Sequence, residues 1–290
     1  MIIREIASRQ NPVFRRLAAI AAESGAAARE SVLLEGFRLC RDALQSGIQP
    51  RCLVFSDRLD PARRDEIASL ASPGTEIVLL SDALFRTLGD TVNPQGAALV
   101  FTRPSAARLE ESVCAGSRYL VLENVQDPGN VGTMIRTADA MGFDGVVILP
   151  GTADPYRAKA IRSAMGSTFH LPVLRAASVR EAADWLRQAG CILYAAHLHG
   201  GELTAHGLAA PGALLVGNEG AGLTDEAVAL ADRLVRIPMP GRAESLNAAC
   251  AAAVLCYSMR IGQNGPESEG IPCKPSSSAA DVSPDTSRRG

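Results

Sequence analysis

Residues 119–132 read Tyr119-Leu120-Val121-Leu122-Glu123-Asn124-Val125-Gln126-Asp127-Pro128-Gly129-Asn130-Val131-Gly132, an apolar strand followed by a polar turn and the start of a helix. Pro128-Gly129 forces a turn, and Asn130 is a residue type that caps helix N-termini. A helix is expected over 131–141 and a second apolar strand over 145–149. This strand–helix–strand order predicts an α/β fold in which mostly parallel strands are covered by helices.

The alternation of strands and helices extends along most of the chain. Before residue 119 we expect helices over 11–22, 37–45, 61–70 and 81–88, and strands over 32–34, 52–55, 77–80 and 97–101. After residue 149 we expect helices over 179–188 and 246–261, and strands over 192–196, 213–216 and 234–237. Arg103-Pro104-Ser105 opens a polar, Ala-rich stretch that separates the two parts. The sequence therefore predicts a smaller α/β domain over 1–103, a linker over 104–116, a larger domain over 117–261 and a disordered tail over 262–290.

Composition excludes several classes of protein. The chain has 290 residues, 47% apolar and 21% charged, which is enough to build a globular core. No apolar run approaches the roughly 18 residues of a membrane span, and the N-terminus lacks an apolar leader. We therefore expect a cytoplasmic protein with no membrane contact. His197-Leu198-His199 has no acidic or Cys partner at a metal-like spacing and no C-x-x-C occurs, so no metal site is expected.

Charge alone gives little indication of a nucleic-acid partner, because the net charge is −2. The kind of basic residue is more informative. Only Lys159 and Lys274 are lysines among the 29 basic residues. Arginine suits bidentate phosphate contacts and stacking on bases, although a GC-rich genome produces the same bias.

The expected final helix, 246–261, has no polar face. A helix that is apolar all round is buried in a core or against a partner chain. Both readings stay open, and Ser245 is a candidate N-cap for this helix.

Two more polar loops follow expected strands. The first is Gly217-Asn218-Glu219-Gly220-Ala221-Gly222-Leu223, and the second is Ile237-Pro238-Met239-Pro240-Gly241-Arg242-Ala243-Glu244-Ser245-Leu246-Asn247. In open α/β sheets, ligands bind at the carboxyl ends of the strands, where these loops begin. The glycines follow the order G-x-x-G-x-G, which is neither the dinucleotide fingerprint nor a phosphate-binding P-loop, and this disfavours a Rossmann dehydrogenase. Arg136, among apolar neighbours, requires an anionic partner in the protein or in a ligand.

Together, the three loops resemble the motifs of the SpoU (TrmH) family of RNA ribose 2′-O-methyltransferases, within the SPOUT superfamily. The resemblance covers about 119–259 and is carried by Asn124–Gly132 with Arg136, by Val216–Gly220, and by Ile237–Met239 with Ser245–Asn247. It implies a parallel sheet tied in a trefoil knot and S-adenosylmethionine as the cofactor. Cofactor contacts are implied at Gly217, Asn218, Ile237, Met239 and Leu246, and a catalytic cluster at Asn130, Arg136, Glu219, Ser245 and Asn247.

Arg136 is expected to clamp a phosphate and stabilise the developing oxyanion. A guanidinium is effectively always protonated in proteins, so it is a poor general base. Ser245 and Asn247 would orient the site, while Glu219 would hold its loop or pair with Arg136.

The N-terminal part resembles the substrate-binding domain, similar to ribosomal protein L30e, that precedes such catalytic domains. Ser8-Arg9-Gln10-Asn11-Pro12 and Leu34-Glu35-Gly36-Phe37-Arg38 carry this likeness over 1–103. Candidate phosphate contacts are Arg9, Arg15, Arg16, Arg38 and Arg41. The resemblance implies a homodimer that acts on structured RNA, with 23S rRNA favoured. A tRNA ribose methyltransferase and a non-catalytic RNA-binding or ribosome-assembly factor remain the alternatives.

Overall fold

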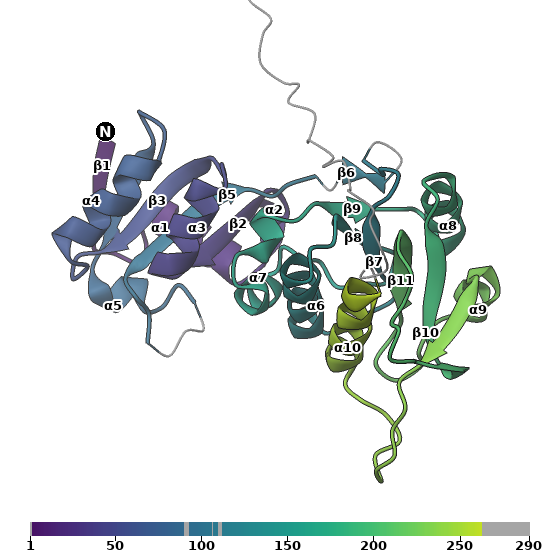
Figure 1. Ribbon diagram of the computed structural model, residues 1–290. Helices are drawn as coiled ribbons and strands as arrows, with labels where there is room; N and C mark the ends of the chain where they lie inside the picture. The colour runs from purple at the N-terminus through teal and green to yellow at the C-terminus, as the bar shows by residue number, and fades with distance from the viewer. Residues whose placement is uncertain (1, 90–92, 106, 110–111, 263–290) are drawn as a thin grey trace, which may run out of the picture.

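A mixed five-stranded sheet forms the N-terminal part of the molecule (Figure 1). The structure is a computed structural model that describes residues 2–89, 93–105, 107–109 and 112–262. The strands are β1 (Ile2–Ile6), β2 (Ser31–Glu35), β3 (Pro50–Ser56), β4 (Glu76–Leu80) and β5 (Ala97–Thr102). They lie in the order β1-β4-β3-β5-β2. The first three of these are parallel, whereas β5 runs antiparallel to both of its neighbours.

Helices cover both faces of this sheet. They are α1 (Pro12–Ala21), α2 (Gly25–Glu30), α3 (Phe37–Gln45), α4 (Pro61–Leu70) and α5 (Asp82–Phe85). Phe14 of α1 and Phe85 of α5 pack with Val54 on one face. Cys40 of α3 and Ile67 of α4 belong to the core on the other face. The helices α1 and α3 therefore lie on opposite sides of the sheet.

A seven-stranded sheet forms the second part of the chain. Its strands are β6 (Ala107–Arg108), β7 (Arg118–Leu122), β8 (Gly145–Ile148), β9 (Val173–Arg175), β10 (Ile192–Glu202), β11 (Gly212–Val216) and β12 (Arg233–Arg236). The order is β12-β10-β11-β7-β8-β9-β6, and every adjacent pair is parallel. The central strands read as unbroken apolar runs because helices cover both faces. The edge strand β6 comes from the segment expected as a linker.

The helices of this part are α6 (Pro128–Ala140), α7 (Ala158–Ala164), α8 (Val179–Gln188), α9 (Asp225–Leu230) and α10 (Ala248–Ile261), with a short 3₁₀ turn, η2, at Ser167–Phe169. The helices α6 and α10 pack on one face of the sheet, and α8 and α9 on the other. Gly132 lets α6 approach α7 closely, since an added Cβ would lie 2.1 Å from the Ala160 carbonyl oxygen.

The two sheets share one stretch of core. Tyr156 and Ile161, from the segment around α7, belong to the apolar cluster that fills the α3 face of the first sheet. Glu23 accepts hydrogen bonds of 2.7 Å from the Ala158 amide and from Nε of Arg157, so it caps α7 from the other sheet's side. Arg103 pairs with Asp154 at the same junction. The two parts therefore pack as one body.

Both helices that border the polar loops begin elsewhere than predicted. The helix α6 starts at Pro128 with Asp127 as its N-cap, so the prediction that Asn130 caps it is wrong. Proline at the first helical position and an Asp cap explain the earlier start. The N-cap of α10 is Asn247, whose Oδ1 accepts from the amides of Ala249 at 2.9 Å and Cys250 at 3.3 Å. Ser245 is therefore not the cap.

The helix α10 is buried on only one face. Ala252, Leu255 and Met259 are buried against α6 and the sheet, whereas Val254 and Tyr257 are 39% and 55% exposed. Of the two readings left open by the sequence, burial of all faces within the chain's own core is therefore excluded, and an apolar face of α10 remains exposed. The structure adds β1, α2, α7 and β9, which the sequence patterns did not predict. The expected tail, apart from Gly262, lies outside the described residues. Within the described ranges, no helix combines the length and apolarity that crossing a lipid bilayer requires.

Candidate active site

The three polar loops leave the same edge of the parallel sheet. Strands β7 and β11 are neighbours, with Leu122 level with Val216. The loops that follow these two residues therefore start side by side, at the carboxyl ends where α/β sheets bind ligands. The third loop, 237–247, begins where β12 ends and leads to α10, which packs on α6.

Glu123 and Asn218 join the first loop to the second. The Glu123 carboxylate is only 7% exposed and accepts hydrogen bonds of 2.8 Å from both the amide and the hydroxyl of Thr224. The side-chain amide of Asn218 donates to the Asn124 carbonyl oxygen at 2.9 Å. The sequence analysis did not assign a role to Glu123. A buried carboxylate directly after a strand was the available signal, because such a group requires hydrogen-bond donors.

Glu219 organises the site. Its Oε1 accepts hydrogen bonds from Nδ2 of Asn130 at 2.8 Å and from the Asp127 amide at 3.2 Å. Its Oε2 accepts from the Gln126 amide at 3.3 Å. Burial alone would raise the pKa of Glu219, but these hydrogen bonds outweigh it and hold the pKa below its ordinary value. Glu219 is therefore a carboxylate at neutral pH, and it holds the first loop against the second.

Asn130 extends this arrangement to the third loop. Its Oδ1 accepts a hydrogen bond of 3.2 Å from Nδ2 of Asn247, while its Nδ2 donates to Glu219. We call Asn130, Glu219 and Asn247 the polar cluster. All three loops therefore meet through three predicted site residues, and the Asn130 amide connects the other two.

Asp127 and Lys159 form an ion pair beside the polar cluster, and the Asp127 amide also donates to Glu219. Both Asp127 oxygens lie 2.9 Å from Nζ of Lys159. The Lys159 ammonium holds the pKa of Asp127 below its ordinary value, so the N-cap of α6 stays charged. Sequence reasoning missed this pair, although Lys159 is one of two lysines in an arginine-rich chain.

Arg136 and Ser245 form no hydrogen bond or ion pair with the polar cluster. Arg136 is exposed on α6 and has no hydrogen bond or ion pair with any described residue. Ser245 is also exposed and likewise forms no hydrogen bond within the described part of the chain. The expected anionic partner of Arg136 is therefore not supplied by this chain's described residues.

The glycine loop closes on itself. The amide of Asn218 donates to Gly222 at 2.9 Å, and the amide of Gly222 donates back at 3.0 Å. A Cβ on Gly217 would lie 2.3 Å from the Gly222 carbonyl oxygen, so only glycine fits there. The close approach that requires Gly217 is thus made by its own loop.

The third loop offers a surface that fits a nucleoside. Backbone groups of residues 238–246 form no hydrogen bond with any described residue, which leaves free amides and carbonyls. Ile237 and Met239 are half-buried beside these groups, and Leu246 is 42% exposed. Apolar side chains next to unpaired backbone donors and acceptors suit a flat base with polar edges. The residues present therefore fit the adenosine part of the cofactor that the motifs imply.

The arginines predicted to contact RNA fall into two groups. Arg9, Arg15 and Arg16 are exposed at the start of the chain and on α1. Arg38 and Arg41 lie on α3, across the sheet, and Arg41 is 3.4 Å from Glu66. The structure therefore does not gather all five on one surface.

Comparison with known proteins identifies two matching families. Residues 117–257 match the SpoU rRNA Methylase family, and residues 3–98 match the MRM3-like substrate binding domain. The chain is 39% identical over 230 residues to the 23S rRNA (guanosine(2553)-2′-O)-methyltransferase RlmP of Bacillus subtilis, covering 79% of this chain and 88% of that protein. It is 32% identical over 232 residues to the 23S rRNA (uridine(2479)-2′-O)-methyltransferase of Streptomyces viridochromogenes, covering 78% and 80%.

A solved structure has the same architecture. The AdoMet-bound rRNA methyltransferase from Sinorhizobium meliloti superposes with a TM-score of 0.80 at 31% identity, over 91% of this chain and 99% of that chain. Its agreement spans both sheets. With the motifs gathered at one sheet edge and a relative matched over most of its length, the chain belongs to the SpoU rRNA methylase family.

Proposed function

We propose that this protein is an S-adenosylmethionine-dependent RNA ribose 2′-O-methyltransferase that acts on 23S rRNA in the cytoplasm. The observation that carries the proposal is the polar cluster, which ties three motif loops together at the carboxyl edge of a parallel sheet. The two relatives described above, whose names specify 23S rRNA 2′-O-methyltransferases, favour rRNA over tRNA. Retention of the whole cluster argues against a non-catalytic assembly factor.

The cofactor would lie against the second and third loops. Bound S-adenosylmethionine supplies an electrophilic methyl group on a sulfonium. We propose that Gly217, Ile237, Met239 and Leu246 contact its adenosine part, with Asn218 alongside. Free backbone groups in residues 238–246 support this assignment. We propose that this segment is threaded in a trefoil knot, and the packing of α10 back onto α6 supports this threading.

The residues of the site would position and activate the ribose. The 2′ oxygen forms a bond to the methyl carbon as the carbon–sulfur bond breaks, and the hydroxyl proton leaves to solvent. A ribose hydroxyl is a poor nucleophile, so stabilising its developing negative charge lowers the barrier. We propose that Arg136 holds the adjacent phosphate and this charge, because it is exposed and has no partner among the described residues. Ser245 and Asn247 would orient the ribose.

A homodimer would complete this site. The face of α10 formed by Cys250, Val254 and Tyr257 is apolar and exposed, which is a costly arrangement for a monomer. We propose that a second copy covers this face. The test is alkylation of Cys250 with and without dilution: a dimer protects the thiol at micromolar concentration and exposes it on dissociation. A monomeric mass at micromolar concentration, with rapid alkylation, would overturn this part.

We also propose that the two parts of the chain have different roles. Residues 1–103, which form the first sheet, would bind RNA. Residues 117–261, which form most of the second sheet, would hold the cofactor and perform methyl transfer. The match of residues 3–98 to a substrate-binding family supports the first assignment.

The proposed reaction is tested by transfer of tritiated methyl from S-adenosylmethionine to unmodified 23S rRNA and, separately, to total tRNA. We expect label in 23S rRNA that maps to a ribose. Label in tRNA alone would reassign the substrate. Absence of label together with absence of cofactor binding by calorimetry would support the non-catalytic alternative.

The role of Arg136 is tested by Arg136→Lys, which keeps the charge and removes the planar fork of donors. We expect kcat to fall about 100-fold, as when one donor to a developing oxyanion is lost, with cofactor affinity unchanged. Near-normal turnover would refute the clamp.

A further inference from the structure

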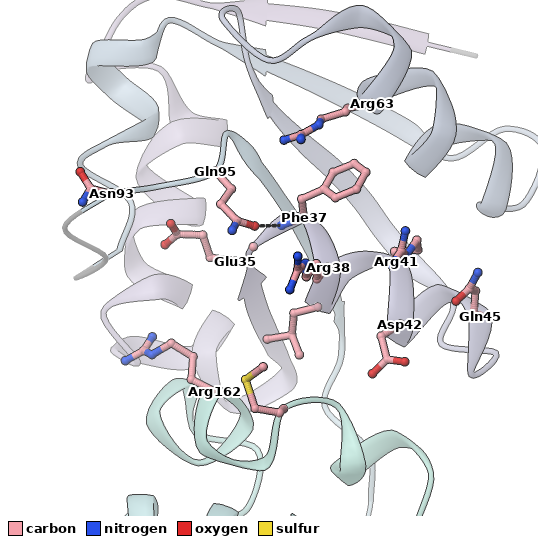
Figure 2. Close-up of a pocket in the computed structure, with 13 residues that line it drawn as sticks. Glu35, Phe37, Arg38, Arg41, Asp42, Gln45, Arg63, Asn93, Gln95 and Arg162 are labelled. Atoms are coloured by element: carbon pink, nitrogen blue, oxygen red, sulfur yellow. Dashed lines mark hydrogen bonds between the residues drawn. The ribbon is translucent and has the colours of Figure 1, made fainter.

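A groove rich in arginines lies between the first sheet's helices and α7 (Figure 2). Its volume is about 910 Å³. Arginines from three helices line it: Arg38 and Arg41 of α3, Arg63 of α4, and Arg162 of α7. Figure 2 shows Arg162 on the helix below the groove and Arg63 above it. Both structural units therefore contribute cations to one surface.

These cations are largely uncompensated. Arg38, Arg63 and Arg162 are exposed and make no ion pair within the described residues. The groove also holds two acids, Glu35 and Asp42, and Asp42 lies 3.3 Å from Nε2 of His170, so the four arginines of the groove leave an excess of positive charge. The surface therefore attracts an anion.

Phe37 arranges two of the arginines. The guanidinium of Arg63 lies 5.3 Å from the centre of the Phe37 ring, and that of Arg41 lies 6.0 Å away. The Phe37 amide donates to Oε1 of Gln95 at 2.9 Å, which fixes the turn that carries the ring. Guanidinium groups held against an aromatic ring lose less conformational freedom when they bind a ligand.

Met165 adds an exposed apolar side chain to the same groove. It is 59% exposed and ends α7 with φ at 51°, the left-handed conformation that glycine usually supplies at this position. Its neighbour Gly166 packs so closely on α3 that an added Cβ would collide with Asp42. A flexible thioether held in solvent beside arginines suits contact with a nucleic-acid base.

The Asp42 end of the groove is separated from the polar cluster by most of the length of α6. His170 bridges Asp42 of the groove and Asp139, with a distance of 3.6 Å between its Nδ1 and the Asp139 carboxylate. Asp139 is near the end of α6 and Asn130 near its start, so about 14 Å of helix separates the two at roughly 1.5 Å per residue. A nucleotide at the Asp42 end of the groove is therefore distinct from the nucleotide that meets the polar cluster, while Arg162, one helical turn after Lys159, lies on the side toward the cluster.

We propose that this groove binds an unpaired stretch of the substrate RNA several nucleotides from the methylated ribose. Arg38, Arg63 and Arg162 contact its phosphates, and Met165 lies against a splayed base. An unpaired strand fits better than a duplex, because only unstacked bases reach an apolar side chain while their phosphates meet arginines. The inference rests on the proposed function, and it makes Arg162 of the catalytic unit part of the RNA-binding surface.

The experiment compares Arg162→Gln with Arg180→Gln, which removes the same charge from α8 on the far face of the second sheet. Binding to unmodified 23S rRNA is measured across a series of salt concentrations, and methyl transfer across a series of RNA concentrations. We expect Arg162→Gln to raise the KM for RNA about tenfold with kcat unchanged. It should also reduce the slope of log affinity against log salt by about 0.7, the value for one phosphate contact on a single strand. Arg180→Gln should change neither quantity.

Met165→Ala separates the base contact from the phosphate contacts. We expect weaker RNA binding with an unchanged salt slope, because no charge is removed. Equal behaviour of Arg162→Gln and Arg180→Gln, in an enzyme that methylates 23S rRNA, overturns the groove assignment and leaves the proposed function intact. Failure of the unaltered protein to bind or methylate either rRNA or tRNA, with the cofactor bound, overturns both. Dependence on Arg162 with tRNA as the substrate keeps the groove and reassigns the RNA.

Discussion

Replacing Asn130 by Asp removes the donor at the centre of the polar cluster while keeping the size of the side chain. The Asn130 Nδ2 that lies 2.8 Å from Oε1 of Glu219 becomes a carboxylate oxygen. The acceptor facing Asn247 is retained. Asn130→Asp therefore brings two carboxylates together in a site that the native chain arranges as donor and acceptor.

The expected loss of stability has two contributions, a lost hydrogen bond and a repulsion between two carboxylates. The lost hydrogen bond to a charged acceptor is worth about 1.5 kcal/mol, the low end of the range because Glu219 is exposed. Two negative charges about 3 Å apart add roughly 1.4 kcal/mol of repulsion at the dielectric constant of water. We therefore expect Asn130→Asp to lower the free energy of unfolding by about 3 kcal/mol at pH 8.

Acid should reduce this deficit. The paired carboxylates share a proton in the folded state, so their pKa rises above the unfolded value. The stability gained by that proton is present at low pH and lost as the pH rises through the folded pKa. In the native chain the pKa of Glu219 is lowered, so the stability that Glu219 contributes is lost as the pH falls. This loss brings the native chain closer in stability to Asn130→Asp at low pH. We expect the deficit at pH 5 to be about half of that at pH 8.

Urea unfolding at the two pH values measures both deficits. The control is Asn11→Asp, which adds the same charge at the N-cap of α1, where Asp accepts the Val13 amide as well as Asn does. The control should stay within about 0.5 kcal/mol of the native chain at both pH values. An Asn130→Asp deficit that is below 1 kcal/mol, or that is the same at pH 5 and pH 8, would refute the reasoning.

Two further substitutions test the packing around α7. Gly132→Ala should destabilise the fold by about 2 kcal/mol, because the new methyl would lie 2.1 Å from the Ala160 carbonyl oxygen and the helix propensity of Ala recovers only part of that strain. Thermal unfolding should show a lower Tm, and an unchanged Tm would mean that α6 and α7 separate freely. Met165→Gly should stabilise the fold by about 1 kcal/mol, because it relieves the left-handed strain at φ of 51°. Urea midpoints measure this gain, and a loss of stability would show that the Met165 side chain contributes packing.

The sequence predicted the strands of the second sheet well because most of them are buried on both faces. Strands such as β7 and β11 read as continuous apolar runs that end in polar loops. Their order across the sheet could not be predicted, since β12 lies beside β10 and not beside β11. Nothing in the spacing of apolar residues records which strands become neighbours.

Short elements and helix starts were harder to predict. The helix α7 has only seven residues and the strand β9 only three, too few to show a period. The starts of α6 and α10 differed from prediction because several consecutive residues can cap a helix, and the choice between Asp127 and Asn130 depends on contacts with Lys159 and Glu219.

The site residues were predicted as a set through the family resemblance, but their connections were not. The sequence places Glu219 and Asn130 eighty-nine positions apart, and only the parallel pairing of β7 with β11 brings them together. The groove with Arg63 and Arg162 was also not predicted, because it arises where two separate sheets meet.

The apolar junction around Ile161 determines how this chain unfolds and where it can be divided into fragments. Ile161 is completely buried, and it completes a core whose other members come mainly from the first sheet. Neither half can leave the other without exposing that core to water, so melting should be a single cooperative event in calorimetry. For the same reason, a fragment that ends near residue 103 would lack Tyr156 and Ile161 and would expose part of its apolar core to water. A fragment that keeps this core intact therefore extends through α7, beyond the residue-103 boundary that the sequence predicted.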